Sequence, residues 1–219
     1  MKAIKNILSI CSVALLLGSC QADLLETKPY GNVAAGNMWT SENFADKGVT
    51  AIYSTLRKSY VGLGLYQMDC LGVSTDCRDA DYPIMRNTIT TSNGMFSSYW
   101  SEHYSGISRA NDAIVHLPEV DMPENKKARY MAEAKVLRAY FYYKLNIMYK
   151  GVPVYLEPVE ASECTKGQET EAAVWQVIED DLTAAINEPN LPNIYTEGSS
   201  DYGRVTKGLA YALRGKAYL

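Results

Sequence analysis

Hydrophobic residues recur at helical spacing in five stretches of the chain. The first stretch follows Ser41, a residue type favoured at helix N-caps, and its hydrophobic residues fall on one face. Prolines or glycines close most of the stretches. The pattern predicts helices over about residues 42–60, 98–117, 125–149, 171–187 and 206–219.

The later helices begin at irregular intervals, yet they carry small and aromatic residues in the manner of tetratricopeptide helices. Examples are Ala-Tyr-Phe-Tyr at 139–142 and Gly-Lys-Ala-Tyr-Leu at 215–219. The sequence therefore predicts a mainly α fold, a tetratricopeptide-like helical scaffold with long inserted loops. On the second helix we expect Trp100 in the core and Asn111 hydrogen-bonded to a neighbouring segment. Residues 152–156 are expected to be extended.

Between the first two helices lies a long stretch with no steady period, residues 61–97, in which 88–91 is a candidate short strand. A loop of this length is too long for a simple connection. Long ordered loops on a rigid scaffold are frequent binding sites. We therefore expect this loop to contribute to a binding site.

The N-terminus has the pattern of a lipoprotein signal. Lys2 and Lys5 precede an apolar run over 7–17, which is shorter than the roughly 20 residues needed to span a bilayer. Leu-Gly-Ser-Cys at 17–20 resembles a lipobox, which makes Cys20 the expected lipidation site. We predict a signal peptide at 1–19, a lipid-anchored tether at 20–37 and a helical domain at 38–219, truncated at the C-terminus because its last helix stops without a cap.

Composition narrows the classes of function. The chain has 47% hydrophobic residues and a net charge of −4, which suits a folded protein and gives no electrostatic footprint for nucleic acid. Seventeen tyrosines against three phenylalanines favour amphipathic aromatic surfaces. Removing Cys11 with the signal and acylating Cys20 leaves Cys70, Cys77 and Cys164, and a bridge between the first two stays open.

Four stretches together resemble the SusD/RagB outer-membrane lipoproteins of Bacteroidetes. They are Cys20-Gln-Ala-Asp-Leu-Leu-Glu, Tyr99-Trp100 with Tyr104, Ile107 and Ala110-Asn111, the run 133–141 continuing to Gly151-Val152-Pro153, and Gly203-Arg204-Val205-Thr206-Lys207-Gly208. The resemblance implies a cell-surface protein that binds a glycan or other nutrient beside a TonB-dependent, SusC-like transporter. Family members are more than twice this long, so the resemblance also implies the N-terminal half.

The resemblance places the long loop on the ligand-facing surface. Sugars are bound by aromatic faces and by planar polar groups that pair with neighbouring hydroxyls. The loop offers both, and we predict these ligand-binding residues: Asp76, Arg78, Asp81, Tyr82, Arg86, Asn93 and Phe96. The alternative is a solvated loop whose charges form local turns and surface pairs.

Catalysis has little support in the sequence. The acids of the loop lack the fixed separation that a glycosidase pair needs. Asp79 and Asp81 suggest calcium weakly, since Pro83 replaces the next ligand. His103 and His116 share one helix with no partner in motif spacing, and we expect both at the surface or its edge. We predict no enzyme, metal or cofactor; a tetratricopeptide-like protein-interaction scaffold is the alternative function, and a surface hydrolase comes third.

Overall fold

The α-helices pack against one another in the order in which they occur along the sequence. The computed structural model describes residues 38–63, 86 and 88–219. Its α-helices are α2 (Glu42–Thr55), α5 (Gly94–His116), α6 (Glu124–Tyr149), α7 (Glu171–Asn187) and α8 (Lys207–Ala217). Short turns of other helix types are η2 (Ser59–Leu63), η4 (Leu117–Glu119) and η5 (Ala161–Glu163), and these described residues contain no strand.

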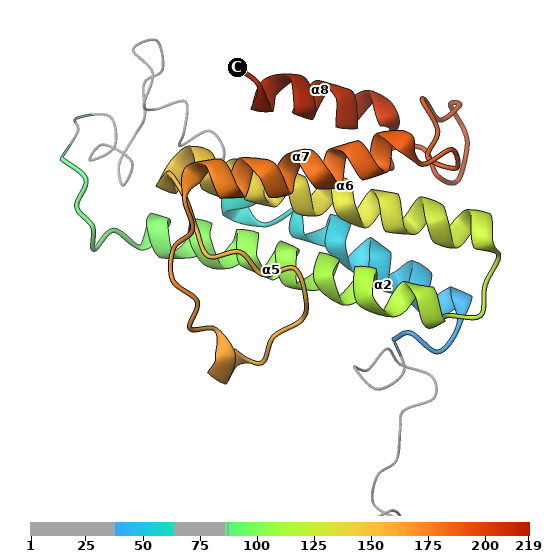
Figure 1. Cartoon of the computed structure of the whole chain (residues 1–219), viewed down its shortest axis with the longest axis horizontal. Helices are drawn as coiled ribbons and strands as arrows, with labels where there is room; N and C mark the ends of the chain where they lie inside the picture. Colours follow the sequence, from blue (N-terminus) through green and yellow to red (C-terminus); the bar gives the residue numbers. More distant parts are fainter. Residues whose placement is uncertain (1–37, 64–85, 87) are drawn as a thin grey trace, which may run out of the picture. The chain divides into compact units, whose positions relative to one another are not determined.

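Each long helix packs against the next one along the chain (Figure 1). α2 contacts α5, α5 contacts α6, α6 contacts α7 and α7 contacts α8, all within one compact unit over 38–219. α6 lies in the middle and is buried on two sides, which explains why its Ala, Leu and Tyr residues surround it instead of forming one face.

The core is built largely from aromatic and branched side chains. Tyr130, Phe141 and Tyr142 of α6 are almost fully buried, and burying one such side chain contributes about 1.5–3 kcal/mol. α5 and α6 approach closely at Gly106, where an added Cβ would lie 2.4 Å from the Phe141 ring. A larger residue there would clash with the Phe141 ring and force the ring or its helix to move.

Polar side chains cap the N-termini of three of the helices. Asn93 Oδ1 accepts a hydrogen bond from Met95 N at 2.9 Å, and Thr170 and Thr206 cap α7 and α8 in the same way. Ser41 occupies the N-cap of α2 as expected, but its side chain makes no capping bond. At the other end of α6, Lys150 and Gly151 both have positive φ, 56° and 106°, and turn the chain sharply into residues 152–160.

The structure confirms a mainly α fold and corrects several details. α2 ends at Thr55, and Gly62 then permits the tight π turn η2, because a Cβ there would meet the Leu56 carbonyl at 2.0 Å. α5 starts four residues before the expected position, and 88–91 forms no strand. The expectation for His103 was wrong, since it is fully buried against Tyr99 and Phe141.

The predicted signal peptide, Cys20 and the tether lie outside the described residues. Within 38–63, 86 and 88–219, no helix is both long enough and apolar enough to cross a bilayer.

Candidate functional site

A hollow of about 400 Å³ opens between α5 and the segment that follows α6. We call it the aromatic hollow, and its lining includes Trp100, Tyr104, Ser108, Tyr155, Glu157 and Lys166. Its size falls in the range of small-molecule sites, which are typically lined by aromatic groups with a few polar ones. It shares several of these wall residues with a second hollow of about 520 Å³ that extends toward α7.

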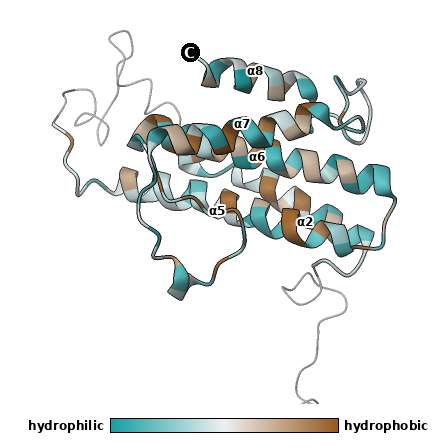
Figure 2. Ribbon diagram, in the orientation of Figure 1, coloured by the Kyte–Doolittle hydropathy of each residue, from teal (hydrophilic) through white to brown (hydrophobic). Residues whose placement is uncertain are grey.

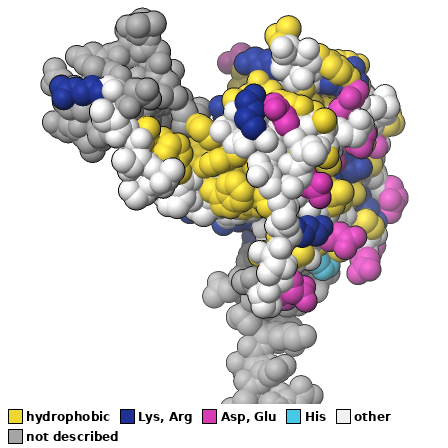
Figure 3. All heavy atoms as spheres, turned by 60° about the vertical axis from the view of Figure 1, so that its left-hand side comes forward, with side chains coloured by type: hydrophobic (Ala, Val, Ile, Leu, Met, Phe, Trp, Pro, Cys, Tyr) yellow, Lys and Arg dark blue, Asp and Glu magenta, His cyan; other side chains and the backbone are white. Residues whose placement is uncertain are grey.

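Aromatic rings follow one side of α5 into the hollow. Phe96, Trp100 and Tyr104 are spaced four residues apart and therefore lie along one face over about 12 Å. The Trp100 and Tyr104 ring centroids are 4.9 Å apart, and Tyr104 meets the Tyr155 ring edge-on at 6.2 Å. Figure 3 brings forward the end of the stack where α5 begins and shows hydrophobic side chains gathered there.

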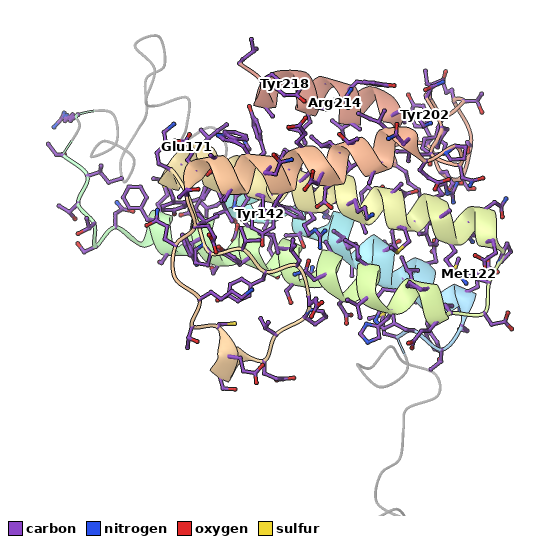
Figure 4. All side chains as sticks on the ribbon, viewed as in Figure 1. Met122, Tyr142, Glu171, Tyr202, Arg214 and Tyr218 are labelled. Carbon is purple, nitrogen blue, oxygen red and sulfur yellow. The ribbon has the colours of Figure 1, made fainter. Side chains whose placement is uncertain are left out.

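The opposite wall, residues 153–157, is an extended segment held by side chains instead of by a sheet. Tyr104 donates its hydroxyl to the Pro153 carbonyl at 2.6 Å. Tyr142 donates to the Tyr155 carbonyl and accepts from the Tyr155 N–H, both at 2.8 Å, from within the helix stack (Figure 4). These bonds satisfy backbone groups that would otherwise need strand partners.

A buried ion pair also helps to hold the 153–157 wall in place. Arg138 of α6 donates Nε and Nη2 to the two carboxylate oxygens of Asp181 at 2.7 and 2.8 Å, and both side chains are 7% exposed. Its Nη1 then reaches Asn111 Oδ1 at 2.8 Å and the Leu156 carbonyl at 3.1 Å. Four donors are thus used on three partners, which fixes the guanidinium in one orientation.

Asn111 connects Arg138 to the wall of the aromatic hollow. Its Nδ2 donates to the carbonyls of Tyr155 and Glu157 at 2.9 and 3.2 Å. This confirms that Asn111 holds a neighbouring segment. Sequence reasoning missed the role of Arg138, although an arginine inside an otherwise apolar helical stretch was the available signal.

The polar groups of the hollow suit binding more than proton transfer. Burial raises the pKa of Tyr104 and of Tyr142 well above the usual value, so both hydroxyls remain donors at neutral pH. Lys166 Nζ lies 5.2 Å from the centre of the Tyr155 ring and also donates to the Val154 carbonyl at 3.1 Å. Glu157 is exposed at the rim. The arrangement offers ring faces and hydrogen-bonding groups side by side.

The residues predicted from the long loop fall into two groups. Asp76, Arg78, Asp81 and Tyr82 lie outside the described residues, as do Cys70 and Cys77. Arg86 is exposed, Asn93 caps α5, and Phe96 packs beside Met95.

Asn93 and Phe96 therefore lie at the end of α5 that leads into the aromatic hollow, and their contact with a ligand stays a prediction. Trp100 packs against the core, as expected, and also lines the hollow, which the sequence did not indicate.

No metal site is built by the part of the chain that the structure describes, since no three His, Cys, Asp or Glu side chains come together there. Cys164 is exposed and free, and it lies at the edge of the aromatic hollow.

Residues 23–219 match the SusD-like_3 family, described as starch-binding and associating with the outer membrane. The chain belongs to the SusD-like family. SusD-like protein P38 of Formosa agariphila is 28% identical over 92% of this chain and 40% of its own length. SusD-like protein P25 of the same organism is 23% identical over 99% of this chain and 43% of its own length.

Solved SusD-like structures share the same tetratricopeptide-like helical fold. A laminarin-binding SusD-like protein superposes with a TM-score of 0.71 at 35% identity, over 82% of this chain and 40% of that one. Surface glycan-binding protein A from Bacteroides uniformis gives a TM-score of 0.69 at 28% identity, over 81% and 41%. This SusD-like chain thus spans about two fifths of these relatives. Membership in a family of glycan-binding proteins supports the expectation that the chain is not an enzyme.

Proposed function

We propose that the chain binds an oligosaccharide at the aromatic hollow. The observation that carries this is the pairing of the Trp100 and Tyr104 rings with a rigid wall of polar groups opposite them. Aromatic faces stack on the C–H side of a sugar ring, while Glu157, Ser108 and Lys166 supply acceptors and donors for its hydroxyls. The laminarin-binding relative, at 35% identity, makes a β-glucan such as laminarin the first ligand to test, with starch as the second.

The test measures retardation of the full-length protein in native gels that contain laminarin or starch. We expect Trp100→Ala to weaken binding about tenfold or more, equivalent to about 1.4 kcal/mol, because it removes a stacking face. Trp175→Ala is the matched control, since Trp175 packs against the Tyr143 ring and does not line the hollow. Equal retardation of the two variants would place the glycan elsewhere.

We further propose that the protein acts at the outer membrane through a lipid on Cys20 and delivers its ligand to a TonB-dependent, SusC-like transporter. The lipobox-like sequence and the family's association with the outer membrane support the anchor. Cells expressing the wild type should transfer radioactive fatty acid to the protein, and Cys20→Ala should abolish the label. A variant that still took up label would exclude this anchor.

The second candidate is a protein-interaction scaffold, and the exposed side chains of α8 favour it. Leu209 and Tyr211 of α8, with Tyr218 just after it, are 44%, 52% and 65% exposed. A pull-down of the full-length protein from detergent-solubilised membranes separates the candidates. Recovery of a large TonB-dependent barrel supports nutrient delivery, whereas recovery of an assembly or secretion complex supports the scaffold.

A further inference from the structure

Another hollow, larger than the two already described, lies where α2, the start of α6 and the loop between α7 and α8 meet. We call it the polar hollow; its volume is about 700 Å³, and its lining includes Asp46, Lys126, Arg129, Asn190, Ser200 and Asp201. Figure 2 shows the first part of α6 and this loop mostly in hydrophilic colours. None of these residues lines the aromatic hollow.

The charged side chains in this wall already have ion-pair partners. Arg129 Nη1 donates to Asp201 Oδ2 at 2.7 Å, and Arg204, also in the wall, donates Nη2 to Asp46 Oδ1 at 2.8 Å. Lys126 Nζ donates to Glu42 Oε1 at 2.7 Å. A charged ligand would have to displace one of these partners, so the wall favours a neutral ligand.

The paired groups still have hydrogen-bonding capacity toward the hollow. The side chains of Asp46 and Lys126 are 39% and 30% exposed, and a carboxylate has about four lone-pair sites while an ammonium has three donors. Asn125, Asn190 and Ser200 add exposed amide and hydroxyl groups. Acceptors and donors therefore both line this one hollow.

Hydroxyl groups match such a wall because each hydroxyl both donates and accepts. Tyr130, the aromatic residue of the lining, is 1% exposed and offers no ring face, so a ligand here would be held by hydrogen bonds without stacking. We propose that the polar hollow is a second binding site of this chain, for a neutral polyhydroxylated ligand of the oligosaccharide class. This site goes beyond the proposed function, which concerns the aromatic hollow.

Calorimetric titration of the full-length protein with laminarihexaose and maltohexaose tests the second site. In the Trp100→Ala background, which weakens the aromatic hollow, we expect residual binding of at least one of these two glycans. Adding Ser200→Trp, which fills the polar hollow with an indole, should weaken that residual binding about tenfold or more. Glu197→Trp is the matched control, because Glu197 is an exposed residue of the same loop outside the lining.

The outcomes separate the two sites. Loss of residual binding with Ser200→Trp but not with Glu197→Trp supports the polar hollow. No residual binding in Trp100→Ala, or equal binding by the two tryptophan variants, overturns it. If Trp100→Ala binds as well as the wild type while Ser200→Trp removes all binding, the aromatic hollow is wrong and the polar hollow stands.

Discussion

The aromatic hollow and the polar hollow differ in where their ion pairs lie. Behind the aromatic hollow, Arg138 and Asp181 are each 7% exposed, and Arg138 holds the wall through the Leu156 carbonyl. In the polar hollow, Asp201 and Asp46 are 28% and 39% exposed and form the wall themselves. One set of charges is shielded from solvent and salt, while the other is open to both.

The two sites are held in place by different kinds of interaction. The 153–157 segment has no strand partner, so its geometry depends on a few buried side chains that each make two or more hydrogen bonds. The polar wall depends on several ion pairs in parallel, and Arg204 alone joins Asp46, Glu133 and Asp201. Loss of one group should therefore be severe at the first site and mild at the second.

The largest effect is expected at Arg138. Arg138→Met leaves Asp181 charged and unpaired in the core, which should lower the free energy of unfolding by about 3–5 kcal/mol in urea titrations. Arg138→Met with Asp181→Leu removes both charges, so the double variant should recover part of the loss. A double variant less stable than the single one would show that Asp181 has other essential partners.

His103 should make the free energy of unfolding fall at acidic pH. Burial lowers the pKa of His103 to about 4, while its Nδ1 lies 2.7 Å from the Tyr99 carbonyl. In the unfolded chain its pKa is about 6.5, so the unfolded state binds the proton first and stability falls as the pH drops from about 6.5 toward 4. The fall attributable to His103 should reach about 3 kcal/mol.

The variant His103→Phe should reduce the dependence of the unfolding free energy on pH, whatever its effect at neutral pH. Ile107→Val, a core change on the same helix without a titrating group, should keep the wild-type dependence. An unchanged pH profile in His103→Phe would assign the acid sensitivity to other groups.

Periodicity was enough to predict α2, α5 and α7, because each of them buries one face, whereas α6 is buried on two sides. The limits of α2 and α5 were harder to place. α2 gives way to a π turn around Gly62, and α5 gains a turn from the Asn93 cap, and both are local hydrogen-bonding choices that leave no hydrophobic period.

Only part of the aromatic hollow could be predicted from the sequence. Trp100 was predicted to lie in the core, and α5 does pack both Trp100 and Tyr104 against the core. What periodicity could not show is that residues 153–166 fold back across these rings, because that depends on the turn at Gly151 and on contacts of Asn111 and Arg138 with distant carbonyls. His103 was misplaced for a related reason: its polar ring is buried by Tyr99 and Phe141, which lie four and 38 residues away.

The smallest effect is expected at Asp201, and it should depend on the salt concentration. Asp201→Asn removes a charge that Arg129 and Arg204 share, yet both guanidiniums keep other acidic neighbours, so the loss should be about 0.5–1 kcal/mol. Raising the ionic strength from about 0.1 M to about 1 M shortens the Debye length from about 10 Å to about 3 Å and should shrink this difference.

Asp181→Asn provides the contrast for Asp201→Asn, since its carboxylate lies beyond the reach of screening ions and its larger loss should persist at high salt. Unfolding titrations of the two variants at both ionic strengths measure this. If the Asp201→Asn loss were equally insensitive to salt, the polar wall would be as shielded as the buried pair. The exposed charge that makes it suitable for a hydroxyl-rich ligand would then be absent.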